Sequence, residues 1–432
     1  MSRITFSAAA GTLVFILWAF CPASGATDPL QASIHGAPWK VEITLYDNPD
    51  SERMYVGDAT LLPHDVLVVP ITWWPRSNVQ RYEWIEEGDA VSLTLVSRDR
   101  GLSWQIYDGP PLPDKIFKLK DGSLLRLRWK AYEQHPNSER EKYQKADYYL
   151  YEIPEKDMFS ITLGFDKQVS RDGGKTWQTS DIQIPHQAEI NGYGMVTARM
   201  LSDGAILMPT YGRPTRHHRV RSCSMLRSGD GGKTWQLIPV AYDDSPGAVG
   251  DDSNSGSSLS SPPPPGVHAF DEAQIVEAKR PGRVIAVIEE QFTKALYTSV
   301  SNDSGKTWSK PRETGMYGVT PLVLRLKSGA IACAYTNRYH GTENERGMWV
   351  CYSPDDGETW DTDRVAILRD TNARADGQCL WNFVQFSDGT LFASGWGLKT
   401  GCGGGNQISY AVGFRFTEDF VTPLRVARPA KR

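Results

Sequence analysis

One eight-residue pattern, Ser-x-Asp-x-Gly-x-(Thr/Ser)-Trp, occurs five times in this chain and constrains its fold more than any other feature. Spacings of 52 to 73 residues between the copies, which we call boxes, indicate a repeated structural unit. In each box the aspartate can accept hydrogen bonds from its own turn, the glycine tolerates positive φ, and the tryptophan can fill apolar space between strands. We therefore assign the boxes a structural role. They begin at Ser97, Ser170, Ser228, Ser301 and Ser353.

A second repeated signal lies upstream of the boxes, where short apolar stretches flank a tight turn. Together the two signals predict a unit of four antiparallel strands, in which strands A and B share the tight turn and strands C and D share the boxed turn. Six such units around an axis make an all-β, six-bladed β-propeller, to which we assign residues 27–432. The tight turns fall at residues 63–65, 120–122, 202–204, 280–282, 327–329 and 387–389.

The sixth unit has no box after Phe416. Its outer strand is either residues 421–426 or a strand donated from the start of the propeller, residues 41–46. The sequence leaves both possibilities open.

Two segments interrupt the repeats. Residues 243–266 are rich in Ser, Gly and Pro and are predicted to form a flexible loop between units three and four. Residues 129–157 are charged and rich in tyrosine, and they fall in the B–C loop of unit two.

The first 26 residues are predicted to be a signal peptide. Arg3 precedes the apolar stretch 11–20, and small residues follow up to Ala26. A lipid anchor on Cys21 is the alternative, but Phe20 before it fits that signal poorly. We expect an exported protein, secreted or periplasmic, with no later membrane span. The net charge of −4, with scattered Lys and Arg, argues against nucleic acid as a partner.

Five cysteines follow the predicted cleavage site, so at least one is unpaired. A Cys379–Cys402 disulfide is plausible, and a Cys333–Cys351 disulfide is geometrically possible. The pair His217-His218 could bind a metal, but adjacent loop histidines more often form polar surface. We expect neither a metal nor another cofactor.

The predicted topology brings polar residues from distant parts of the chain to one end of the ring. If the tight and boxed turns share one end, the other end carries the starts of strands A and the ends of strands B around a central depression. Paired carboxylates there can cleave glycosidic bonds, so we expect a carbohydrate substrate. The predicted catalytic residues are Glu272, Asp58, Asp271 and Glu289. The predicted substrate-binding residues are Arg338, Arg213, Arg76, Tyr193, Tyr317, Trp73, Trp74, Trp381 and Trp396.

The boxes, and their place between strands C and D, resemble those of the sialidase (neuraminidase) superfamily over nearly the whole chain from Trp39 onward. Residues 271–277 (DEAQIVE) are similar to a motif whose glutamate partners the catalytic tyrosine, and the resemblance assigns that role to Glu272. Arg338, after residues 335–337 (YTN), resembles an arginine that ends strand B in bacterial relatives.

Other positions depart from the sialidase pattern. Val56 and Glu289 occupy positions where that family has arginines, and Leu380 falls near the position of its tyrosine. A carboxylate at position 289 would repel sialic acid, and the three-arginine carboxylate clamp is not assembled. We therefore predict a substrate other than standard sialosides.

These observations lead to one leading hypothesis and two alternatives. The leading hypothesis is an exo-acting glycoside hydrolase with Glu272 as the central carboxylate and Asp58, Asp271 or Glu289 as its partner. The enzymatic alternative is a polysaccharide lyase on an acidic glycan, with Tyr or His as the base. The other alternative is a carbohydrate-binding propeller without catalytic activity.

Overall fold

The computed structural model describes most of the chain after the predicted signal peptide. The described residues are 39–48, 51–75, 80–82, 85–87, 90–108, 116–130, 132–192, 198–249, 265–337, 347–370, 379–398 and 409–423. The predicted signal peptide and Cys21 lie outside them. None of the helices in these ranges is long and apolar enough to cross a membrane.

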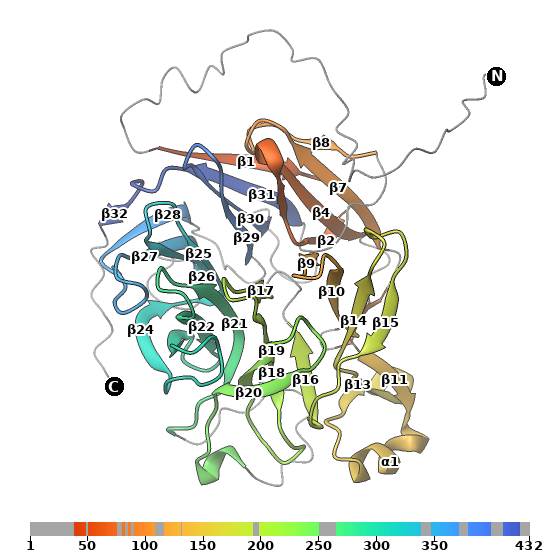
Figure 1. Ribbon diagram of the computed structural model, residues 1–432. Coiled ribbons are helices and arrows are strands. Elements are labelled where there is room, and N and C mark those ends of the chain that lie inside the picture. Colours follow the sequence, from red (N-terminus) through yellow and green to blue (C-terminus); the bar gives the residue numbers. More distant parts are fainter. Residues whose placement is uncertain are drawn as a thin grey trace, which may run out of the picture.

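Six antiparallel sheets, each built on four main strands, surround a central axis, which confirms the predicted six-bladed propeller (Figure 1). Unit one contains β2 (Ser51–Val56), β3 (Thr60–Leu62), β4 (Val66–Pro75), β7 (Val91–Ser97) and β8 (Gln105–Ile106). Unit two contains β9 (Phe117–Lys118), β10 (Leu124–Trp129), β14 (Phe165–Ser170) and β15 (Gln178–Asp181). Unit three contains β16 (Glu189–Gly192), β17 (Arg199–Met200), β18 (Ile206–Arg213), β19 (Ser222–Ser228) and β20 (Gln236–Ala241).

The second half of the ring repeats this arrangement. Unit four contains β21 (Phe270–Glu277), β22 (Val284–Glu290), β23 (Ala295–Ser301) and β24 (Arg312–Tyr317). Unit five contains β25 (Val319–Arg325), β26 (Ile331–Asn337), β27 (Gly347–Ser353) and β28 (Arg364–Asp370). Unit six contains β29 (Cys379–Gln385), β30 (Leu391–Leu398) and β31 (Ser409–Phe416).

The outer strand of unit six comes from the start of the propeller. β1 (Lys40–Tyr46) pairs antiparallel with β31, so the first strand of the ring completes the last sheet. The alternative, an outer strand from residues 421–426, is wrong: β32 (Thr422–Pro423) pairs with β28 at the edge of unit five. A donated strand removes an open sheet edge and holds the two ends of the ring together.

The boxes form the hydrogen-bonded turns expected of them. In the fourth box the Asp303 carboxylate accepts bonds from the Ser301 hydroxyl (2.7 Å), the Thr307 amide (2.9 Å) and the Thr307 hydroxyl (2.6 Å). The same carboxylate contacts recur in the other four boxes. Burial raises the pKa of Asp303, but these bonds outweigh it and hold the pKa at about 2. Each box is therefore a charged turn whose aspartate is bonded within the turn itself.

The box glycines also set the packing between units. Gly305 has a φ of 80°, and a Cβ at this position would lie 2.8 Å from the Leu207 side chain of the preceding unit. Gly357 stands in the same relation to Ile285, at 2.9 Å. Buried apolar side chains fill the space between successive sheets, as in the cluster of Leu207, Ile275 and Ala286 between units three and four. The glycine is thus required both by backbone conformation and by the neighbouring sheet.

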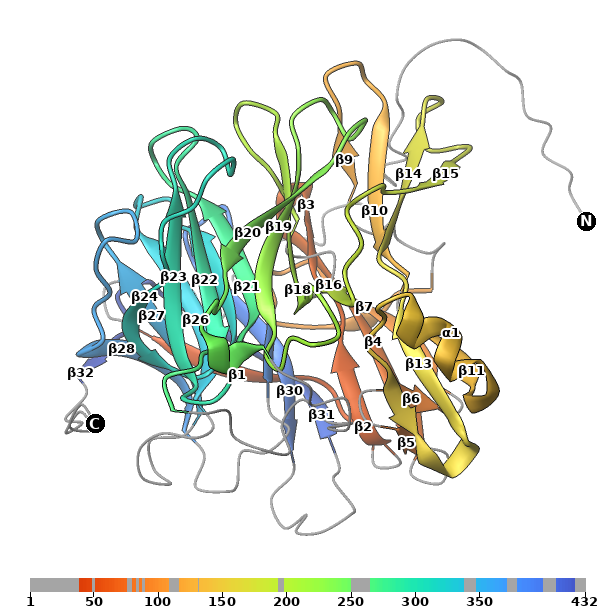
Figure 2. The ribbon, with the colours of Figure 1, turned by 90° about the horizontal axis from the view of Figure 1, so that it is seen from below.

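The tight turns and boxed turns occupy one end of the ring, as predicted. The Ser304 amide in a box donates to the Gly282 carbonyl in a tight turn (2.9 Å), and Arg100 in another box pairs with Asp388 in the tight turn of unit six (3.0 Å). Figure 2 shows the β9–β10 and β14–β15 hairpins at this end, with α1 (Arg140–Lys145) towards the opposite one. We call the opposite end the mouth.

The insertion in unit two folds into a small sheet of its own. Its strands β11 (Tyr132–Pro136), β12 (Tyr151–Ile153) and β13 (Met158–Thr162) pair in the order β11-β13-β12, with α1 between β11 and β12. It lies between β10 and β14, in the predicted B–C loop. The Tyr149 amide donates to the Ala188 carbonyl (2.9 Å), so the insertion is attached to unit three. A β5–β6 hairpin (Gln80–Tyr82 and Ile85–Glu87) lies in the corresponding loop of unit one.

The start of the segment 243–266, which is predicted to form a flexible loop, makes contacts with the residues that follow the segment. Asp243 accepts bonds from the amides of Ser245 (2.8 Å) and His268 (2.6 Å), which ties the two ends of the loop together. Ala248 is then fully buried with Val267. Composition alone does not reveal such a capping carboxylate.

The cysteines that the structure describes are buried. Cys333 and Cys351 are cross-strand neighbours in β26 and β27, as predicted, but both are free thiols. The Sγ atom of Cys379 donates to the Thr320 hydroxyl (2.9 Å), and Cys402 lies outside the described residues.

Two glycine substitutions separate backbone strain from packing between units. Gly305 and Gly329 both have positive φ. A Cβ added at Gly305 would have a neighbour within 4 Å, whereas a Cβ added at Gly329 would have none among the described residues. We expect Gly305→Ala to lower the free energy of unfolding by about 1–3 kcal/mol more than Gly329→Ala, because only it forces Leu207 to move. Denaturant unfolding monitored by tryptophan fluorescence measures both. Equal losses would contradict the proposed inter-unit contact.

Candidate active site at the mouth of the ring

The inner strands of the ring share an irregularity near the mouth. The β-ladder shifts register between Asp271 and Gln274 in unit four, and at matching heights in units five and six. In unit one the inner strand breaks between β2 and β3. Such bulges bend a strand, re-aim its side chains and are common beside active sites. The residues within these irregularities include Asp58, Glu272, Thr320 and Trp381.

Glu272 has an unusual backbone conformation for a glutamate. Its φ is 46°, and its amide donates to the Oδ1 atom of Asp271 (2.9 Å). The side chain is partly exposed. Burial raises the pKa of Tyr211 in unit three, and the Asp271 and Glu272 carboxylates add to this shift. A positive φ on a non-glycine residue is costly, and such residues cluster at functional sites.

Asp271 and Glu289 form a buried pair of carboxyl groups. They are cross-strand partners on β21 and β22 and are only 2% and 4% exposed. Arg221 donates to Asp271 (3.0 Å), and Lys294 donates to Glu289 (2.9 Å). Burial raises the pKa of Asp271 to about 7; Arg221 opposes this shift and Glu289 adds to it. Asp271 therefore exchanges its proton near neutral pH.

Arg221 connects this pair to a second buried carboxylate, Glu189. The Arg221 guanidinium donates to Glu189 (2.7 Å), which also pairs with Arg213 and accepts a short bond from the Tyr151 hydroxyl of the insertion. Burial raises the pKa of Glu189, but the two arginines outweigh it and lower the pKa to about 2. Units three and four and the insertion are thus joined by alternating buried charges.

Arg213 does not occupy the predicted substrate-binding position. It is 2% exposed, pairs with Glu189 and stacks 4.0 Å over the ring of Tyr149. Sequence position placed it correctly at the end of strand B, but could not show that a carboxylate already binds it.

The aromatic residues predicted for the mouth divide into two groups. Trp381 donates to Asp58 (3.2 Å) and contacts Trp396, with ring centroids 5.5 Å apart. Tyr55 lies edge-to-face against both Trp396 (5.3 Å) and Trp74 (5.4 Å). We call Tyr55, Trp74, Trp381 and Trp396 the aromatic shelf. Trp73 packs against the apolar cluster between units one and six, which Trp396 of the shelf also contacts.

Of the remaining predicted residues, the structure describes only Tyr317. Tyr317 ends β24, the outer strand of unit four, and its hydroxyl donates to Glu313 on the same strand (2.6 Å). It was expected at the start of an inner strand, but that strand begins two residues later. Arg338, Arg76 and Tyr193 lie outside the described residues.

Arg221, at the mouth end of unit three, and Arg199 are two residues that the sequence patterns did not single out. Arg199 lies on β17, which Figure 1 shows near the centre of the ring, and it pairs with Leu207 close to the tight turn of unit three. Burial lowers the pKa of Arg199 to about 10, and the Asp58 carboxylate acts in the opposite direction. The available signal for Arg221 was the buried carboxylate at Glu189, which requires a cation nearby.

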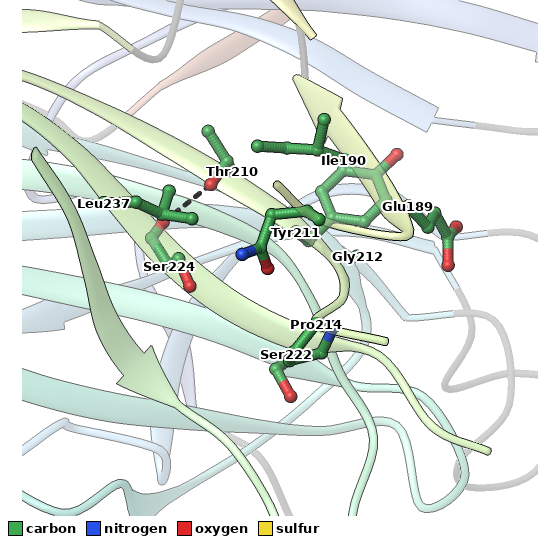
Figure 3. A pocket seen from close by; sticks show the side chains of 10 residues that line it. Glu189, Ile190, Thr210, Tyr211, Gly212, Pro214, Ser222, Ser224 and Leu237 are labelled. Atoms are coloured by element: carbon green, nitrogen blue, oxygen red, sulfur yellow. Dashed lines mark hydrogen bonds between the residues drawn. The ribbon is translucent and has the colours of Figure 1, made fainter. Parts of the chain in front are cut away.

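A separate pocket lies across one face of unit three rather than at the axis (Figure 3). Its lining comes from β16, β18, β19 and β20 of that sheet and includes Glu189, Tyr211, Ser224 and Leu237. Its cavity volume of about 10 Å³ is far below the roughly 300–1,000 Å³ typical of ligand pockets. In the parts of the chain that are described, no group of three or more His, Cys, Asp or Glu is arranged to hold a metal ion.

The fold is that of a sialidase-type propeller, and solved structures support this class. A protein of unknown function from Dyadobacter fermentans superposes with a TM-score of 0.60 at 19% identity, covering 88% of this chain and 99% of that one. NanB sialidase from Streptococcus pneumoniae gives 0.52 at 12% identity, covering 92% and 73%. An α-L-arabinofuranosidase from Fusarium graminearum gives 0.50 at 13% identity, covering 87% and 97%. At these identities the similarity shows the fold alone.

The family follows from the repeats themselves. The BNR repeat-like domain matches residues 155–412, more than half of the chain, and the protein belongs to this family. Curated protein sequences contain no significant match to it.

Removing Arg221 tests the buried network. Arg221→Ala removes an arginine that pairs with both Glu189 and Asp271, and we expect a loss of about 3–5 kcal/mol in unfolding free energy. Arg140→Ala removes the partly exposed Arg140–Glu152 pair of the insertion and should cost about 1 kcal/mol or less. Thermal and denaturant unfolding measure both variants. Similar losses of unfolding free energy would show that Arg221 contributes no more to stability than Arg140 does.

Proposed function

We propose that this protein is a glycoside hydrolase that acts at the mouth of the ring, with Glu272 and Asp58 as its catalytic carboxyl groups. The observation that carries the proposal is that both carboxylates lie at irregular positions of inner strands, in units one and four of the six. Both side chains are partly exposed, whereas Asp271 and Glu289 are buried. A substrate at the axis would therefore meet Glu272 and Asp58 first.

Asp271 and Glu289 have a supporting role in this proposal. Asp271 accepts the amide of Glu272, and so holds the bulge that presents the Glu272 side chain. Glu289 lies across the ladder from Asp271 and is neutralised by Lys294. Both carboxyls act through Glu272 because burial separates them from the substrate.

Several observations favour a substrate other than a sialoside. Within the described part of the mouth, the buried Arg213 and Arg221 and the partly buried Lys294 each pair with a carboxylate. The family position of a substrate-binding arginine holds Glu289, and Val56 is 1% exposed in an apolar cluster. The same pairing disfavours a lyase on an acidic glycan, which needs cations for the uronate carboxylate.

We also propose that the protein is exported, since its first 26 residues have the pattern of a signal peptide. A glycoside hydrolase in that compartment would meet extracellular or periplasmic glycans.

Conservative amide substitutions test the catalytic assignment. We expect Glu272→Gln and Asp58→Asn each to lower kcat/KM by at least about 100-fold, because each removes a proton donor or acceptor while keeping side-chain shape. A reducing-end assay on aryl glycosides and neutral plant or algal polysaccharides gives the readout. Glu277→Gln, at the far end of the same strand, should retain activity and serves as the control.

Three outcomes would redirect the proposal. Ultraviolet-absorbing unsaturated products would indicate a lyase. Glycan binding without turnover in the wild type, retained in Glu272→Gln, would indicate a binding protein. Ready release of sialic acid would contradict the argument from Val56 and Glu289.

A further inference from the structure

The aromatic shelf lies at the seam where the ring closes. Its members come from β2 and β4 of unit one and from β29 and β30 of unit six. Tyr55 is the central member, because its ring contacts both Trp74 and Trp396 edge-to-face. Trp381 extends the shelf from Trp396 to the carboxylate of Asp58.

The shelf differs in burial from the aromatic core beneath it. All four of its side chains are partly exposed, whereas Phe386, Phe392 and Phe414 of unit six are fully buried. Aromatic rings that stay partly open to solvent retain a flat apolar face for a ligand.

The polar groups around the shelf indicate what ligand it would take. The Trp381 indole donates to Asp58, so a carboxylate lies at one edge of the aromatic faces. A flat apolar face bordered by a few fixed polar groups suits a ring with C–H bonds on its faces and hydroxyls at its rim. A carboxylate at this edge repels an ionised acidic sugar, but it can accept hydrogen bonds from the hydroxyls of an uncharged one.

We infer that the aromatic shelf is a subsite for an uncharged pyranose ring of a glycan, bound next to Asp58. This inference rests on the proposed function for the location of the reacting bond, and it adds the class of sugar. The sugar ring would stack on the indoles of Trp381 and Trp396, with its hydroxyls bonded to Asp58. The neighbouring sugar would then extend over the axis towards Glu272.

Binding measured without turnover tests the subsite. In the Glu272→Gln background, neutral gluco-, manno- and galacto-oligosaccharides are titrated by calorimetry and tryptophan fluorescence, alongside oligogalacturonates of equal length. We expect micromolar to millimolar binding of at least one neutral series, weakened about tenfold or more by Trp381→Ala and by Trp396→Ala. Trp381→Phe should restore part of the loss. Trp177→Phe, in a box at the other end of the ring, should bind as the parent does.

The outcomes for the shelf and for catalysis are separable. Unchanged affinity in both tryptophan variants would overturn the subsite, even if Glu272→Gln and Asp58→Asn abolish hydrolysis. Weakened affinity with full activity in Glu272→Gln would support the subsite and contradict the catalytic assignment. Tighter binding of the oligogalacturonates than of every neutral series would overturn the assignment to uncharged sugars. Circular dichroism at the titration temperature establishes that each variant is folded.

Discussion

The antiparallel pairing of β1 with β31 is the contact on which the rest of the structure depends. It joins the start of the propeller to its last sheet, and its apolar side chains continue into the cluster between units six and one. Asp58 and Trp381 are 323 residues apart in sequence and meet only because the ring is closed. The mouth, the aromatic shelf and the proposed catalytic pair all follow from this closure.

The residues that join units three and four differ from those of the proposed catalytic pair, although some are neighbours in the chain. The charges of Glu189, Arg213, Arg221 and Asp271 are buried and mutually paired, so they fix how units three and four meet. Glu272 follows Asp271 in the chain but lies in a bulge with positive φ and remains accessible. Buried ion pairs are weak evidence for stability, but they can specify one arrangement among several. Here that arrangement is the one that presents Glu272.

Much of the fold was predictable because its signals are local. The boxes and the tight turns each depend on side chains within a few residues, so five boxes and six turns defined the units and the end of the ring that carries the mouth. The cross-strand relation of Asp271 to Glu289 followed from counting along one hairpin, and the structure has them as partners. The choice of β1 as the donated strand depends on pairing across the whole chain, which local pattern does not encode.

The site was less predictable because its contacts join residues that are far apart in the sequence. Bulges at Glu272 and Trp381 depend on register, and alternation of apolar residues does not reveal a shift of one residue. Arg213 was placed at the correct end of its strand, but its pairing with Glu189 is a contact between strands and side chains that only the fold brings together. Arg221 lies in the loop that leads into a strand and carries no motif.

The central claim is that carboxylates of units one and four act on one ligand at the ring axis. The most direct measurement is a crystal structure of the Glu272→Gln protein with an oligosaccharide from a glycan that the wild type cleaves. The account predicts electron density for a glycosidic oxygen within hydrogen-bond distance of residue 272 or of Asp58, with one sugar ring stacked on Trp381 or Trp396. A sugar bound in the unit-three pocket lined by Tyr211 and Ser224, with an empty axis, would contradict it.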